Sequence, residues 1–87
     1  MNPDKLRCYG EFLHGEYWMR PLARDLNIND RTVRRWANGH PIPKNLESEL
    51  LALSAAHYIR IKLLGLPIPQ LPDARIVGLA KKMVKGF

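Results

Sequence analysis

The sequence predicts an all-α protein, a compact bundle of four to five helices, and three observations support this fold class. First, 46% of the 87 residues are hydrophobic and 25% are charged, which is the balance of a globular chain. Second, apolar residues recur at helical spacing between turn signals, as with Leu6, Tyr9 and Leu13. Third, no segment sustains the alternation of apolar and polar residues that a strand requires, so we expect no sheet.

Capping and turn residues divide the first half of the chain into three short helices. The pair Asn2-Pro3 is typical of a helix start, and Gly15 is typical of the end of that helix. A second helix is expected to start at Arg20-Pro21, because the residue before a proline avoids the helical conformation. Asn29 is an N-cap residue type and predicts a third helix behind it. The stiff segment 40–43 then leads to a longer helix.

The fourth helix, expected from about Lys44 to Leu64, has two apolar sides. One side carries Leu46, Leu50, Leu53, His57, Ile61 and Leu64, and the other carries Leu51, Ala55 and Tyr58. Such a helix needs two packing partners. After Gly65 a proline-rich linker leads to a fifth helix that Asp73 caps, with an apolar arc opposite a basic one. We therefore divide the chain into a bundle over residues 1–65, a linker over 66–72 and an amphipathic C-terminal helix over 73–87.

The charge is large and unevenly distributed. The formal net charge is +6, and the sequence pI is about 9.9. Residues 20–44 hold six basic and two acidic residues, and residues 60–87 hold six basic and one acidic residue. Such basic blocks favour polyanionic partners, nucleic acid above all.

Other features of the sequence exclude several classes of protein. The single cysteine, Cys8, cannot form an internal disulfide, the start has no hydrophobic secretory segment, and no apolar stretch reaches the ~20 residues of a membrane helix. The sequence lacks metal-ligand spacing, a phosphate-binding glycine loop and a catalytic triad pattern. We therefore expect a cytoplasmic protein that is not an enzyme, with no cofactor, no metal, no membrane contact and no small-molecule ligand.

The second and third helices carry a specific spacing. Ala23 is a small residue where two helices cross, Asn27 four residues later tolerates a left-handed turn, and Val33 and Trp36 follow at positions that face the core. Two short helices joined in this way form a helix-turn-helix, with core contributions expected from Leu22, Leu26 and Ile28. The stretch MRPLARDLNINDRTVRRWANGHPIP resembles the helix-turn-helix of the lambda-repressor and Cro-like (XRE-type) DNA-binding regulators. The resemblance covers Glu16 to about Leu53.

The resemblance implies that the third helix enters the major groove of DNA. It places Asn29, Asp30, Arg31 and Arg35 at base edges. It places Thr32 and Arg34 at the phosphate backbone or flanking bases. Met19 stands where many relatives have a phosphate-binding glutamine, and we expect the basic residues Arg20, Arg24 and Lys44 to contact the backbone. The chemistry agrees, because an arginine fork matches guanine O6 and N7 and a carboxylate accepts from cytosine N4.

We therefore expect a sequence-specific regulator of transcription that binds double-stranded DNA. Within this class we expect a repressor or autoregulator of phage or antitoxin type that binds a pseudo-palindromic operator as a homodimer. We expect it to be of prokaryotic or phage origin and to be associated with the nucleoid. The alternative is a small helical protein-interaction module without specific DNA binding. RNA is disfavoured because a recognition helix cannot enter the deep, narrow A-form groove.

The sequence leaves more than one packing partner open for the C-terminal helix. Its apolar arc either packs on the second side of the fourth helix or forms the dimer contact, and binding to a membrane surface is disfavoured. The expected dimer residues are Leu51, Tyr58, Ile76, Leu79, Met83 and Phe87. Tyr17 and Trp18 are expected to close the end of the first helix as packing residues, and Trp36 is expected in the core.

Overall fold

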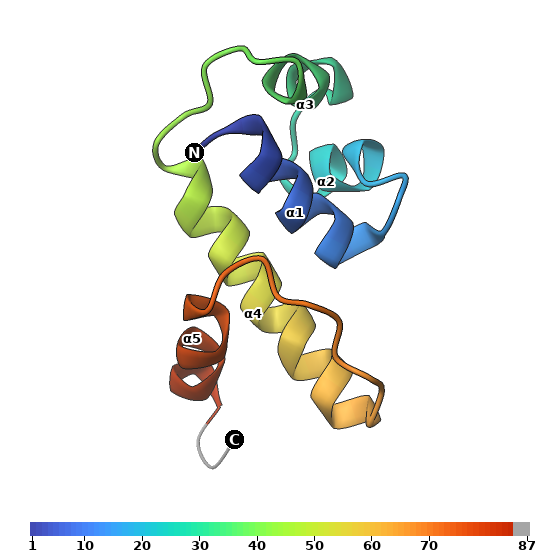
Figure 1. The fold of residues 1–87 in the computed structure, drawn as a ribbon, viewed down its shortest axis with the longest axis vertical. Helices are drawn as coiled ribbons and strands as arrows, with labels where there is room; N and C mark the ends of the chain where they lie inside the picture. The colour runs from blue at the N-terminus through green and yellow to red at the C-terminus, as the bar shows by residue number, and fades with distance from the viewer. Residues whose placement is uncertain (85–87) are drawn as a thin grey trace.

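The five helices follow the order in which the turn residues divide the chain. The computed structural model describes residues 1–84. The helices are α1 (Pro3–His14), α2 (Met19–Asp25), α3 (Asp30–Ala37), α4 (Leu46–Leu64) and α5 (Arg75–Met83) (Figure 1). No strand occurs within the described residues, so the predicted all-α bundle is confirmed. The expected fourth helix begins two residues later than predicted, and Phe87 lies outside the described residues.

One end of the molecule is a cluster of the first three helices around the start of α4. Helix α1 contacts α2, α3 and α4, and α2 contacts α3. Figure 1 shows α4 extending away from this cluster, with α5 beside its lower half. The largest side chains that are completely buried come from each helix: Leu6, Tyr9, Leu22, Val33, Leu50 and Ile76. One hydrophobic core therefore runs through all five helices.

Helix α4 is covered on two sides, as its sequence predicts. Its buried residues are Leu46, Leu50, Ser54, Ala55, Tyr58 and Ile61. Helix α5 packs on α4 and contributes Ile76 and Ala80, both completely buried. The C-terminal helix therefore completes the core of its own chain. Leu64, expected on the inner side, is 66% exposed because α4 extends beyond its neighbours at this end.

This packing corrects part of the expected dimer surface. Tyr58 is 7% exposed and Ile76 is 0% exposed within the single chain. Subunits that pack side by side cannot use these two residues, since α4 and α5 already cover them. Leu51 and Leu79 are half-buried, and Met83 is 51% exposed.

Two further predictions of burial are wrong. Tyr17 is 84% exposed, whereas its neighbour Trp18 is 4% exposed. The Trp18 ring lies on α1 at Gly10, whereas the Tyr17 side chain is turned to solvent. Ile28, expected in the core, is 37% exposed. It lies in the short turn before α3, where the side chain is covered on one side only.

Trp18 packs directly on the backbone of α1 at Gly10. A Cβ atom at Gly10 would lie 2.2 Å from Cε3 and 2.3 Å from Cδ2 of the Trp18 ring. No side chain fits at that separation, so the contact requires glycine in the middle of a helix. This requirement outweighs the lower helix propensity of glycine.

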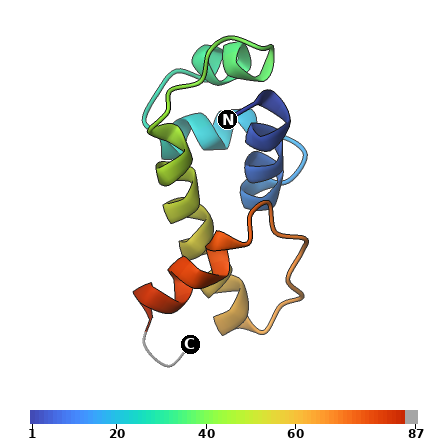
Figure 2. The same cartoon turned by 60° about the vertical axis from the view of Figure 1, so that its left-hand side comes forward.

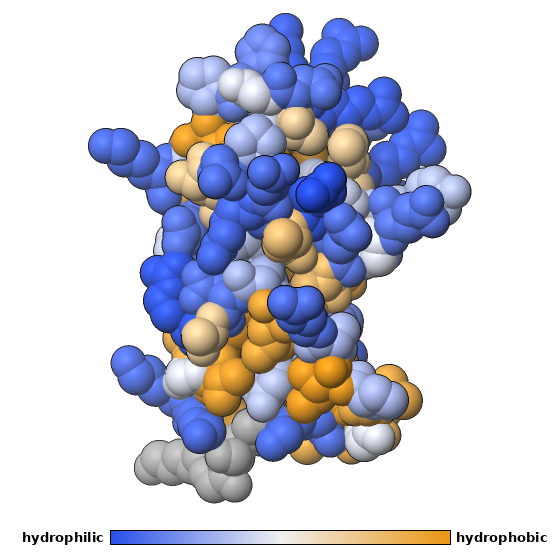
Figure 3. Space-filling view, in the orientation of Figure 1, coloured by the Kyte–Doolittle hydropathy of each residue, from blue (hydrophilic) through white to orange (hydrophobic). Residues whose placement is uncertain are grey.

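The linker returns the chain from the far end of α4 to α1. Figure 2 shows residues 66–72 looping out and coming back beside α1, where α5 begins. Apolar side chains at this end stay exposed, among them Leu63 at 75%, Leu66 at 54% and Ile68 at 41%. Figure 3 shows apolar surface gathered over the lower half of the molecule, whereas the upper end is mostly hydrophilic.

A polar cluster around Asp73 joins α5 to α1 and α4. The Asp73 carboxylate lies 3.1 Å from Nζ of Lys5 and accepts a hydrogen bond of 3.4 Å from the Tyr9 hydroxyl. It also accepts a 2.9 Å hydrogen bond from the backbone N–H of Arg75, the first residue of α5, although Ala74 and not the predicted Asp73 occupies the N-cap position. The Arg75 guanidinium donates to Asp73 and to Glu47 of α4.

This cluster shifts the pKa of Asp73 and of Tyr9. The hydrogen bonds from Arg75, supported by Lys5, hold the pKa of the Asp73 carboxyl well below its usual range. Burial, followed by the negative charge of Asp73, raises the pKa of the Tyr9 hydroxyl to about 12. Tyr9 therefore stays protonated and donates to an ionised Asp73 across the neutral pH range.

The contact between Gly10 and Trp18 predicts opposite effects for two glycine-to-alanine changes. Gly10→Ala should lower the free energy of unfolding by about 1–3 kcal/mol, because the added methyl group overlaps the indole ring. Gly78→Ala is the matched control in α5, where a Cβ meets nothing within 4 Å. It should raise that free energy by about 0.5–1 kcal/mol. Urea denaturation of both variants measures the difference, and equal changes would contradict the packing.

The Asp73 cluster predicts a stability contribution that depends on pH. Asp73→Asn should lower the free energy of unfolding at pH 7 by about 1–2 kcal/mol, because Lys5, Tyr9 and Arg75 lose an ionised partner. The folded pKa lies below that of an unfolded aspartate, about 3.9, so the contribution is present above that pH and is lost as the pH falls below it.

Denaturation of wild type and variant from pH 7 down to pH 3 measures this difference. Asp4→Asn is the control, because the side chain of Asp4 is exposed and its ion pair with the exposed Arg7 is long, at 3.8 Å. Its effect should be smaller than that of Asp73→Asn, because Asp4 contributes only an exposed ion pair and a charge in the first turn of α1. A difference between wild type and Asp73→Asn that does not shrink in acid would contradict the role of the ionised carboxylate.

Candidate nucleic-acid interface

Helices α2 and α3 meet at a tight turn whose conformation follows from Asn27. This residue has φ 56°, and among the described residues it is the only non-glycine with a positive φ. The turn is held by the N–H of Ile28, which donates to the carbonyl of Ala23 at 2.9 Å. Ala23 is 3% exposed, in keeping with its predicted place at the helix crossing. The predicted left-handed turn at Asn27 is confirmed.

The inner side of α3 is anchored by two apolar residues. Val33 is 0% exposed and Trp36 is 9% exposed, so both predicted core positions are confirmed. The start of α3 is fixed by Asn29, whose side-chain oxygen accepts a 2.9 Å hydrogen bond from the N–H of Arg31. Asn29 is therefore the N-cap, and this use of its oxygen leaves its amide N–H₂ as the group free to contact a partner.

The outer side of α3 presents arginines to solvent. Arg31, Arg34 and Arg35 are exposed, and Thr32 is half-buried. Within residues 1–84, Arg31 and Arg35 form no ion pair. Their guanidinium groups therefore keep all their donors available for an external ligand.

Asp30 holds two other arginines together. Its carboxylate lies 3.5 Å from the Arg34 guanidinium, one turn along α3, and 3.8 Å from Nε of Arg20 on α2. The negative charge also lies in the first turn of α3, where the helix dipole favours it. Asp30 was predicted to read a base, and the structure engages its carboxylate in this ion-pair network.

The remaining predicted backbone contacts lie apart from this network. Arg24 is exposed in the last turn of α2, and Lys44 is exposed in the segment that precedes α4. Among the described residues, neither forms an ion pair with the network around Asp30. The structure thus brings Arg20, Asp30 and Arg34 together.

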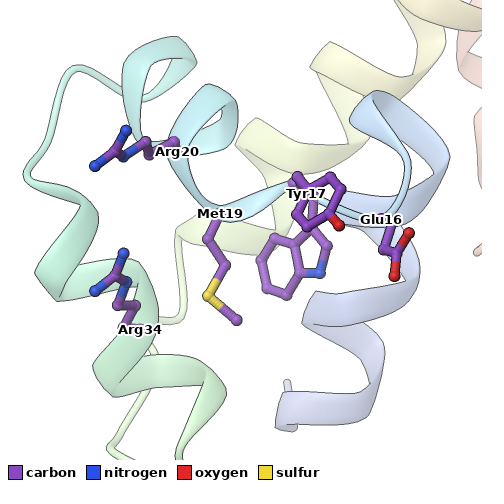
Figure 4. A pocket seen from close by; sticks show the side chains of 6 residues that line it. Glu16, Tyr17, Met19, Arg20 and Arg34 are labelled. Atoms are coloured by element: carbon purple, nitrogen blue, oxygen red, sulfur yellow. The ribbon is translucent and has the colours of Figure 1, made fainter.

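A hollow of about 410 Å³ lies beside the arginines, at the junction of the α1–α2 loop with α3. Its walls are formed by Glu16, Tyr17, Trp18, Met19, Arg20 and Arg34. Figure 4 shows the two guanidinium groups at one end, Met19 in the middle, and Tyr17 and Glu16 at the other end. Helical periodicity does not predict this hollow, because Glu16 and Tyr17 lie in the loop, outside any helix.

No protein-family model, curated protein or solved structure matches this chain significantly. Within residues 1–84, no three His, Cys, Asp or Glu side chains are grouped closely enough to hold a metal ion. None of the helices described here has the length and apolar character needed to cross a membrane.

The cap at Asn29 predicts a difference between two asparagines. Asn29→Ala should lower the free energy of unfolding by about 0.5–2 kcal/mol, because the N–H of Arg31 loses its acceptor. Asn45→Ala is the matched control, since Asn45 precedes α4 without a side-chain capping bond and should have little effect. Thermal unfolding followed by circular dichroism compares them. The cap assignment is wrong if Asn29→Ala is no less stable than Asn45→Ala.

Proposed function

We propose that this chain is a sequence-specific regulator of transcription that binds double-stranded DNA, with α2 and α3 as its helix-turn-helix. The observation that carries the proposal is the division of α3 into two sides. Val33 and Trp36 anchor the inner side, while Arg31 and Arg35 are exposed on the outer side without an ion pair inside the described chain. Arginine bidentate to guanine is the commonest specific contact to a base in the major groove.

The dimensions and charge of this region support the proposal. Helix α3 has eight residues and is therefore about 12 Å long, a size that the major groove admits. Arg20 and Arg34, paired through Asp30, present a second positive group beside it. Phosphate contacts of this kind position a protein on DNA, while the free arginines select sequence.

Two finer parts of the proposal concern the operator and the subunits. One recognition helix contacts few base pairs, so regulators of this size commonly pair across a two-fold axis. We therefore propose a homodimer on a pseudo-palindromic operator that acts as a repressor or autoregulator. Of the expected dimer residues, Leu51, Leu79 and Met83 keep exposed surface for a second copy.

A protein-interaction module is the second candidate function. Leu63, Leu64 and Leu66 are more than half exposed at the far end of α4, and exposed apolar groups of this kind mark interaction sites when they are contiguous. The two candidates differ in their response to salt. Binding to DNA weakens steeply as salt rises, because counterions are released from phosphates. Binding through an apolar surface is much less sensitive to salt.

Arginine substitutions test the proposed division between base and backbone contacts. Arg31→Ala or Arg35→Ala should each cost about 1–3 kcal/mol on the preferred operator and relax the sequence preference at one base pair. Arg20→Ala and Arg24→Ala should weaken binding to operator and random DNA alike and lower the salt slope by about 1 each. Operators selected from random duplexes, followed by titration at several salt concentrations, provide the measurements.

Two outcomes would contradict this assignment. Equal losses on operator and random DNA for Arg31→Ala and Arg35→Ala would remove both residues from base reading. A wild-type chain that binds no duplex at 50 mM salt would remove the DNA-binding function itself.

A further inference from the structure

Tyr17 is the most exposed large hydrophobic residue among those described, and it lies just after the end of α1. It is 84% exposed. The next residue, Trp18, is 4% exposed and packs on Gly10 of α1. Gly15, with φ 80°, ends α1 two residues earlier. The burial of Trp18 fixes the backbone next to Tyr17, so the loop presents the phenol ring to solvent beside α2 and α3.

The hollow beside Tyr17 combines three kinds of surface. Arg20 and Arg34 form a cationic wall, and Met19 provides an apolar surface between them and Tyr17 (Figure 4). Tyr17 provides a flat ring with a hydroxyl donor at the opposite end. The backbone of a DNA strand presents groups in an order that matches this surface. A phosphate is followed by the apolar face of a deoxyribose and then by a second phosphate.

We propose that Tyr17 is a further DNA-contacting residue and that this hollow holds one strand of the DNA backbone beside α3. The phosphate on one side lies against Arg20 and Arg34, the deoxyribose lies over Met19, and the Tyr17 hydroxyl donates to the following phosphate. Tyrosine is among the side chains that make such phosphate contacts. The inference rests on the proposed function and adds a neutral residue from outside the two helices to the DNA-binding surface.

Glu16 sets a limit on this arrangement. It lines the same hollow next to Tyr17, and its carboxylate repels a phosphate. The DNA strand therefore enters from the arginine side and passes Tyr17, with Glu16 at the edge. Removal of this charge should strengthen binding to every duplex, because like charges no longer face each other.

The test compares Tyr17 variants on operator and random duplexes. Tyr17→Ala should weaken binding to both by a similar factor, about five- to ten-fold, and Tyr17→Phe should weaken it by a smaller factor. Because tyrosine is neutral, the slope of log K against log salt should stay at the wild-type value. Glu16→Gln should tighten binding to both duplexes. Leu63→Ala is the matched control, since Leu63 is 75% exposed at the far end of α4, and it should change nothing.

The outcomes separate this inference from the proposed function. If Tyr17→Ala binds as tightly as wild type while Arg31→Ala loses affinity, the Tyr17 contact is wrong and the DNA-binding function stands. If the wild-type chain binds no duplex, the function itself fails. If Tyr17→Ala loses affinity and also unfolds at lower urea than Leu63→Ala, Tyr17 has a structural role and the inference is overturned.

Discussion

The architecture depends on the burial of α4 on two sides. Leu50 on one side and Ala55 on the other are completely buried, so the helix lies between the N-terminal cluster and α5. A helix of 19 residues with this pattern cannot be stable in water with either side uncovered. Helices α1 and α5 contact α4 directly, and α2 and α3 are packed on α1 and on each other.

A polar cluster lies where α5 meets α1 and α4. Asp73 accepts from Lys5 and Tyr9 of α1 and from Arg75 at the start of α5, and Arg75 also donates to Glu47 of α4. Apolar packing alone has little directional preference, whereas hydrogen bonds are directional, so the contacts to Asp73 add an orientation to the apolar packing of α5 on α4. The low pKa of Asp73 reflects the same arrangement, because all its partners favour the charged form.

The arginines of the candidate DNA surface fall into two groups, those that pair with Asp30 and those that have no ion-pair partner in the described residues. Asp30 neutralises part of the charge of Arg20 and Arg34 and holds them near one another. Arg31 and Arg35 have no such partner within residues 1–84, and they extend from a helix whose other side is fixed by Val33 and Trp36. Rigid support for a few unpaired donors is what a surface that reads base edges requires. The proposed contact at Tyr17 would extend this candidate surface beyond the two helices.

The sequence by itself determined the helices and the inner side of the α2–α3 unit. Caps and breakers act locally, so Asn2, Gly15 and Asn29 mark helix ends without knowledge of the rest of the fold. The turn at Asn27 and the burial of Ala23, Val33 and Trp36 also follow from local spacing.

Only the tertiary structure decided which of two similar residues is covered. Trp18 and Tyr17 are adjacent aromatics, and it is Trp18 that lies on Gly10 while Tyr17 is exposed. Tyr58 and Ile76 carry the apolar character of a dimer contact, yet α4 and α5 of one chain bury them together. The convergence of Lys5, Tyr9 and Arg75 on Asp73 joins residues up to 68 positions apart in sequence. Contacts at such separation depend on how helices pack, and no local pattern encodes them.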